Sequence, residues 1–134
     1  MKTVVSICFV LAVFTCSVIA GKLQIIVEES VEDCEYRAQR GDSLYTYYTG
    51  TFENGEVFDS NVGRAPYGPF TLGSRHVIEG MDLGTLGMCE GEKRKLIIPS
   101  ELAYGEGGYG DVIPPDSTLI FEVVLDRIIR KDEL

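Results

Sequence analysis

The sequence pattern that most resembles a known functional motif is a glycine-rich run late in the chain. Residues 105–110 read GEGGYG and match the GxGxxG spacing of dinucleotide-binding loops. Such a loop needs a helix N-terminus after it, so that backbone N–H groups and the helix dipole face the pyrophosphate. Pro114 and Pro115 follow the run and cannot build that helix. We therefore expect a glycine-rich loop and reject a nucleotide site.

Other reactive side chains are sparse. His76 is the only imidazole, and its neighbours Arg75 and Val77 supply no activated nucleophile of the kind that Ser-His-Asp or Cys-His catalysis requires. We expect His76 in a loop before a short helix. The acidic run from Glu28 to Glu35 lacks the alternating pattern of a calcium loop. A solvated face is its simpler interpretation, with weak calcium association as the alternative, and we expect no cofactor and no metal site.

The remaining candidates are apolar and aromatic, and an ordinary hydrophobic core and a binding pocket both explain them. Composition and periodicity do not choose between the two. The set comprises Tyr48, Phe58, Tyr67, Phe70, Val77, Ile78, Met81, Tyr104, Ile113 and Phe121, with Asp59 beside Phe58.

Alternation and turn signals predict the elements that position these side chains. The predicted strands are residues 23–27, 43–52, a hairpin return beginning at 57–58, 69–73, 93–98 and 118–129. Asn54-Gly55 is the strongest hairpin signal. Residues 61–69, rich in Gly and Pro, predict a loop or bulge, and apolar spacing over 77–86 predicts a short helix.

These elements predict a single domain of the α+β class. An antiparallel sheet with one buried face needs a cover, and the short helix is the available one. The length of 134 residues allows one domain of ordinary size. The formal net charge of −9 argues against a nucleic-acid binder, which needs a basic surface.

The two ends of the chain indicate the compartment. Residues 1–20 combine Lys2, an apolar run and a small residue, Ala20, before Gly21, which is typical of a cleaved secretory signal peptide; an uncut signal anchor is the alternative. Residues 131–134 read KDEL, the retrieval address of the endoplasmic reticulum. We therefore expect a protein of the endoplasmic-reticulum lumen that binds the retrieval receptor through this tail and has no membrane span after signal removal.

The cysteines follow from that location. Two of them lie in the predicted signal peptide, which leaves Cys34 and Cys89. Two thiols in an oxidising compartment indicate one disulfide, worth about 4 kcal/mol as a constraint on the unfolded chain. A redox role is a weaker interpretation because there is no CxxC motif, and zinc needs more ligands than these residues and one distant His supply.

Several short motifs, taken in order, resemble the FKBP-type peptidyl-prolyl isomerases. They begin with Tyr48-Thr49-Gly50 and Val57-Phe58-Asp59-Ser60. They continue with Phe70-Thr71-Leu72-Gly73, Val77-Ile78-Glu79-Gly80, Gly91-Glu92-Lys93-Arg94, Leu102-Ala103-Tyr104-Gly105, Ile113-Pro114-Pro115 and Thr118-Leu119-Ile120-Phe121. The resemblance covers roughly residues 40–129 and is strongest to the secreted branch of that family, in which the cysteines corresponding to Cys34 and Cys89 are paired.

The resemblance implies a fold and a site. The fold would be an antiparallel five- or six-stranded half-barrel wrapped around one short helix, within a domain of residues 21–130. The catalytic residues would be Tyr48, Phe58, Asp59, Tyr104 and Phe121. The residues that bind substrate would be Tyr67, Phe70, Val77, Ile78, Met81 and Ile113, with Met81 on the pocket floor, where the family usually has Trp.

The resemblance also implies an activity. The chain would accelerate rotation about X–Pro bonds in folding secretory polypeptides, which needs no nucleophile, and would bind the macrolides tacrolimus and rapamycin in the same pocket. The alternatives are a non-catalytic binding module or chaperone with this fold and, more remotely, an acidic calcium-associated scaffold of the lumen.

Overall fold

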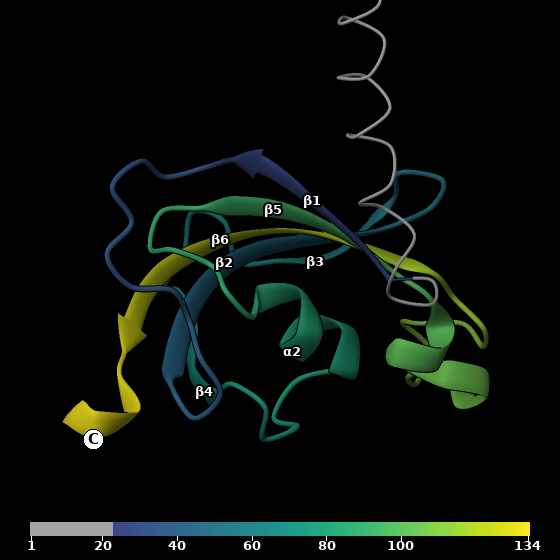
Figure 1. Cartoon of the computed structure of the whole chain (residues 1–134). Coiled ribbons are helices and arrows are strands. Elements are labelled where there is room, and N and C mark those ends of the chain that lie inside the picture. The colour runs from purple at the N-terminus through teal and green to yellow at the C-terminus, as the bar shows by residue number, and fades with distance from the viewer. Residues whose placement is uncertain (1–22) are drawn as a thin grey trace, which may run out of the picture.

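A computed structural model describes residues 23–134 of the chain (Figure 1). The predicted signal peptide, residues 1–20, lies outside the described residues. The strands are β1 (Gln24–Glu29), β2 (Ser43–Phe52), β3 (Val57–Ser60), β4 (Tyr67–Thr71), β5 (Lys93–Ile98) and β6 (Leu119–Ile129). The helix α2 spans Glu79–Thr85, and short 3-10 turns occupy Ser100–Leu102, Gly105–Gly107 and Lys131–Glu133.

The six strands form one antiparallel sheet with the order β1-β5-β6-β2-β3, and β4 also pairs with β2. The long strands β2 and β6 are paired along their whole length, from Ser43 opposite Ile129 to Phe52 opposite Leu119. Figure 1 shows the sheet curving over α2. The predicted α+β class and the half-barrel around one helix are therefore confirmed, with six strands.

The core lies between the concave face of the sheet and α2. On β6, which corresponds to the strand predicted over 118–129, alternate residues are buried: Leu119, Phe121, Val123 and Leu125. The same alternation buries every second residue of β5. The opposite, convex face keeps partly exposed and charged side chains, and Lys93 there lies 3.4 Å from Glu122.

Helix α2 is short and packs tightly on β5. A Cβ atom at Gly80 would lie 2.3 Å from the Ile98 side chain, and one at Gly84 would lie 2.5 Å from the Leu96 side chain. Only glycine permits this approach, because real Cβ atoms do not come closer than about 3.0 Å to such neighbours. The helix predicted over 77–86 is confirmed in a shorter form.

Strand β4 corrects the loop predicted over residues 61–69. The strand begins at Tyr67, opposite Thr46 of β2, and continues through Gly68 and Pro69. Gly and Pro favoured a loop in the sequence, but within residues 23–134 β4 pairs only with β2. At such an edge Pro costs the sheet no hydrogen bond, since no further strand needs its missing N–H group.

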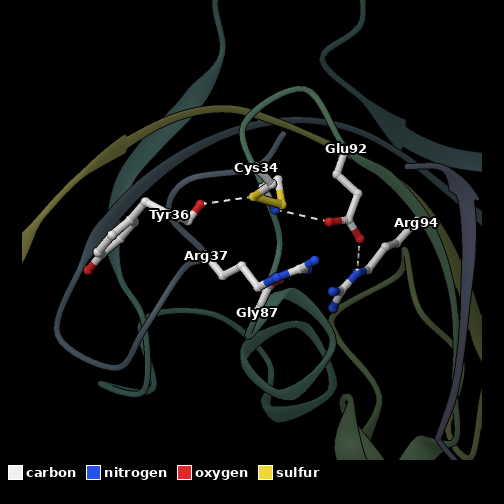
Figure 2. The surroundings of a disulfide bond; sticks show 7 residues. Cys34, Tyr36, Arg37, Gly87, Glu92 and Arg94 are labelled. Atoms are coloured by element: carbon white, nitrogen blue, oxygen red, sulfur yellow. Dashed lines mark hydrogen bonds and ion pairs between the residues drawn. A yellow bond between two sulfur atoms is a disulfide. The ribbon is translucent and has the colours of Figure 1, made fainter. Parts of the chain in front are cut away.

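A disulfide and a buried ion pair secure the end of α2 (Figure 2). Cys34 and Cys89 are bonded, with Cα atoms 6.0 Å apart, which confirms the predicted pairing. The Cys89 backbone N–H donates to the Glu92 carboxylate (2.9 Å), and the same carboxylate accepts a hydrogen bond from the Arg94 guanidinium. Arg94 also donates to two carbonyl oxygens, those of Gly84 and Leu86, at 2.9 Å each.

Candidate active site

A cavity of about 430 Å³ opens between the N-terminal side of α2 and the concave face of β2, β3, β4 and β6. Its lining is mostly apolar and aromatic, and ten of the eleven pocket residues predicted from the sequence contribute to it. The lining residues are Thr46, Tyr48, Phe58, Asp59, Tyr67, Phe70, His76, Val77, Ile78, Met81, Tyr104 and Phe121.

Aromatic rings build one wall of the cavity by packing edge against face. The ring centroids of Phe58 and Phe121 lie 5.6 Å apart at an interplanar angle of 89°. Tyr48 lies 6.0 Å from Phe121 and 6.2 Å from Tyr67, the latter at 87°. Rings in these arrangements favour one another beyond the area they bury. The wall is therefore held in shape by its own contacts, without filling the space in front of it.

The main polar feature of the wall is a hydrogen bond between two neighbouring strands. The Tyr48 hydroxyl on β2 donates to the Asp59 carboxylate on β3 over 2.7 Å. Burial, together with this bond to a carboxylate, raises the pKa of Tyr48 to about 12. The phenol therefore stays protonated at neutral pH and continues to donate to Asp59, which leaves the carboxylate fixed at the cavity edge.

Asn61 supports this pair from the adjoining turn. Its side-chain oxygen accepts the Tyr48 backbone N–H at 2.7 Å, and its amide nitrogen donates to the Thr46 carbonyl at 3.0 Å. These bonds occupy the stretch of β2 beside its bulge, where the register with β4 and β6 shifts. Asn61 therefore fixes the backbone that carries Tyr48.

The hydrogen-bond donors that the lining offers to a ligand include the Ile78 backbone N–H and the Tyr104 hydroxyl. Within residues 23–134, no acceptor takes the Ile78 backbone N–H or the Tyr104 hydroxyl. Burial raises the pKa of Tyr104, and the electrostatic effect of the neighbouring Tyr109 raises it further. The Tyr104 hydroxyl therefore also remains a donor at neutral pH. A carbonyl-bearing molecule in the cavity would satisfy both groups.

The structure places three residues differently from the expectation. Ile113 is 3% exposed and lies in the hydrophobic core, outside the cavity lining. Thr46 and His76 line the cavity although the sequence did not single them out for it. His76 lies before α2, as predicted, where its Nδ1 accepts the Thr71 backbone N–H at 3.2 Å. The inward alternation 44, 46, 48 along β2 was the signal that could have found Thr46.

Among the described residues, no group of three or more His, Cys, Asp or Glu side chains could hold a metal ion. No helix within residues 23–134 is long and apolar enough to cross a membrane. The cavity walls consist mainly of rings and aliphatic side chains, with a few polar groups that include donors, so the arrangement is suited to enclose a small apolar ring and to hold the carbonyl groups beside it.

Comparisons of the sequence and of the structure with known proteins all identify the same family. The family model described as FKBP-type peptidyl-prolyl cis-trans isomerase matches residues 34–126. The chain is 50% identical to the peptidyl-prolyl cis-trans isomerase FKBP2 of Homo sapiens, over 98% of this chain and 94% of that protein. It is 46% identical to the peptidyl-prolyl cis-trans isomerase FPR2 of Saccharomyces cerevisiae, over 87% and 91% of the two chains. The crystal structure of AtFKBP13 superposes with a TM-score of 0.71 at 34% identity, covering 80% of this chain and 93% of that one.

Proposed function

The chain belongs to the family of FKBP-type peptidyl-prolyl cis-trans isomerases, and we propose that the cavity between α2 and the sheet is its catalytic site. The observation that carries the proposal is the combination of an apolar, ring-lined cavity with donors, among them the Ile78 N–H and the Tyr104 hydroxyl, that no described residue uses. Peptidyl-prolyl isomerisation is the family's activity, and the roles of individual residues below are part of the proposal.

The reaction needs an environment more than it needs a reactive group. Rotation about a peptide bond meets a barrier of about 18–20 kcal/mol because twisting destroys amide resonance. The twisted amide is less dipolar than the planar one, so leaving water costs it less. A water-poor apolar cavity therefore binds the transition state better than the ground state, and each tenfold acceleration requires about 1.4 kcal/mol of that difference.

In this proposal, apolar side chains of the cavity enclose the proline ring. Met81 of α2 forms the floor, and it is only 8% exposed. The other enclosing residues are Phe58, Val77, Ile78 and Phe121, with Tyr67 and Phe70 at the side of β4. Met81 is unbranched and adaptable, so it keeps the floor apolar while its shape adjusts to the ring.

The polar groups orient the substrate. The Tyr104 hydroxyl and the Ile78 backbone N–H would each donate to a substrate carbonyl, since neither has an acceptor within the described chain. Tyr48 and Asp59 would set the polarity of the opposite wall through their 2.7 Å hydrogen bond. Ile113 would act indirectly, because its buried side chain anchors the loop that follows Tyr104.

The cellular setting extends this proposal. We propose that residues 21–130 form the isomerase domain and that it serves secretory polypeptides with slow X–Pro bonds in the endoplasmic-reticulum lumen. The side chain of Leu134, the last residue of the KDEL tail, is 73% exposed, which suits capture by a retrieval receptor. Tacrolimus and rapamycin, as family ligands, would bind in the same cavity and compete with substrate.

A rate assay with an X–Pro peptide tests the site. Phe58→Ala should lower kcat/KM strongly by opening the wall, and Tyr104→Phe should lower it by removing a single donor, worth about 0.5–1.5 kcal/mol or roughly two- to twelvefold. Val62→Ala is the matched control, because Val62 is 66% exposed and lies outside the lining. Rapamycin should abolish turnover. Full activity in both pocket variants would refute the assignment, and binding without turnover in the wild-type protein would favour a non-catalytic module.

A further inference from the structure

A second tyrosine extends the cavity wall beyond its lining. The ring of Tyr109 stacks on that of Tyr104 with centroids 5.1 Å apart and an interplanar angle of 33°. Tyr104 lines the cavity, whereas Tyr109 does not, and Tyr109 is 60% exposed. The stack therefore continues the aromatic surface outward from the site of the proline ring and leaves one ring largely open to solvent.

The loop that carries Tyr109 is held firmly in place. The Tyr109 backbone N–H donates to the Ile113 carbonyl at 2.8 Å, and the Ile113 N–H returns a bond to the Tyr109 carbonyl at 3.0 Å. Gly108, with φ of 66°, sits so close to this bridge that a Cβ atom would lie 2.3 Å from the Ile113 oxygen. Because the Ile113 side chain is buried in the core, the Tyr109 backbone is anchored relative to the cavity, and its ring rests on that of Tyr104.

The loop that carries this ring is acidic. Between Pro99 and Thr118 the sequence contains no Lys, Arg or His. Glu106 and Asp111, which flank Tyr109 along the loop, are both exposed. The face of an aromatic ring attracts cations, and a long basic side chain can lay its apolar stem on the ring while its charge stays in water. A flanking carboxylate on a substrate would instead be repelled.

We propose that Tyr109 is a specificity-determining residue whose exposed ring receives the substrate side chain that flanks the proline on the Tyr104 side, and that it favours lysine or arginine there. The inference rests on the proposed function of the cavity, since it treats the Tyr104–Tyr109 stack as a continuation of the catalytic wall. It identifies the preferred substrates as X–Pro segments with a basic residue next to the proline.

Paired peptides test the inference. One series varies the residue before proline and the other varies the residue after it, with lysine, its uncharged counterpart norleucine, or glutamate at the varied position. In the series that varies the residue on the Tyr104 side of the proline, the wild-type protein should show a kcat/KM about two- to fivefold higher for lysine than for norleucine, as expected for an exposed cation–π contact. Glutamate should be the poorest of the three.

Variants then separate the ring from the charge of the loop. Tyr109→Phe should keep the lysine advantage, whereas Tyr109→Leu, which retains apolar area without a ring, should bring the lysine-to-norleucine ratio close to one. Val112→Ala is the matched control, because Val112 is also exposed on this loop (51%) but is not aromatic, and it should leave the ratio unchanged.

Three results would overturn the inference. A wild-type ratio near one in both series would show that no basic residue is preferred. A lysine advantage that survives Tyr109→Leu would assign the preference to the surrounding carboxylates. A ratio lost equally in Val112→Ala would assign it to loop shape. Turnover of the norleucine peptides by the wild-type protein keeps the function of the cavity intact in all three cases, whereas no turnover of any peptide would refute both proposals.

Discussion

Replacing Arg94 with methionine should destabilise the protein more than any surface change on the same strand. Arg94 is 9% exposed and Glu92 is 3% exposed, so their ion pair is largely withdrawn from water. Arg94→Met keeps a long apolar side chain but leaves the Glu92 carboxylate buried without its counter-ion (Figure 2). It also removes the donor that the Gly84 and Leu86 carbonyls share at the end of α2.

The expected loss is large relative to the stability of a domain. Breaking a buried ion pair on one side costs about 3–5 kcal/mol, because the remaining charge stays unpaired in a poorly solvated place. Domains of this size have unfolding free energies of about 5–15 kcal/mol. With a urea m-value of about 1.5 kcal/mol/M, the midpoint of unfolding should fall by roughly 2–3 M.

Equilibrium urea unfolding followed by circular dichroism measures this loss, and Lys93→Met is the matched control. Lys93 lies beside Arg94 on β5, but its ion pair with Glu122 (3.4 Å) is partly exposed to solvent and should contribute less than about 1 kcal/mol. The double variant Glu92→Gln with Arg94→Met should regain part of the loss, because glutamine buries no charge and still offers an oxygen to the Cys89 N–H. If Arg94→Met loses no more stability than Lys93→Met, the ion pair does not secure α2 and the reasoning is refuted.

Three further predictions concern the disulfide, the alkaline limit and the aromatic wall. The double variant Cys34→Ala with Cys89→Ala releases a link across 55 residues and should lower the urea unfolding free energy by about 4 kcal/mol; a loss below about 1 kcal/mol would contradict the chain-entropy account. Since folding raises the pKa of Tyr48 from near 10 to about 12, through burial and the bond to Asp59, its contribution to stability is complete below pH 10 and lost as the pH rises towards 12. Tyr48→Phe should therefore flatten the fall in Tm between pH 10 and 12, and an unchanged slope would argue against the shift. Gly50→Ala should cost about 1–3 kcal/mol and depress kcat/KM, since its Cβ would lie 2.5 Å from the Phe58 ring; wild-type values in both measurements would show that the wall yields freely.

Periodicity and turn chemistry predicted most of the fold because those signals are local. The residues of β5 alternate cleanly and those of β2 are rich in strand-forming Tyr and Thr, so the predicted spans 93–98 and 43–52 agree with the observed strands. The strand predicted over 69–73 corresponds to β4, but its first residues were predicted as loop because Gly68 and Pro69 indicate a break, and only the pairing with β2 shows that they lie at an edge. The local sequence of a segment does not determine which strand that segment will pair with.

The partners in the buried polar contacts could not be predicted from the local sequence either. The alternation of β5 placed Arg94 on the inner side with Leu96, but nothing in the sequence said that Glu92 would accompany it. A charge on a buried face is costly unless it is paired, so the alternation alone already implied that Arg94 has a partner there. Which partner it has depends on the turn that brings Cys89 and Glu92 together.

Whether the aromatic set forms a solid core or a cavity is decided by the length of α2. Its seven residues extend about 10 Å, whereas the ten residues of β2 extend about 33 Å, so the helix covers only part of the concave face. Gly80 and Gly84 draw the helix onto β5, away from β3. The rings of Tyr48, Phe58 and Phe121 therefore pack against one another and face an open space. The same alternation buries a residue under the helix or exposes it to the cavity, and for this reason periodicity alone could not distinguish core from pocket.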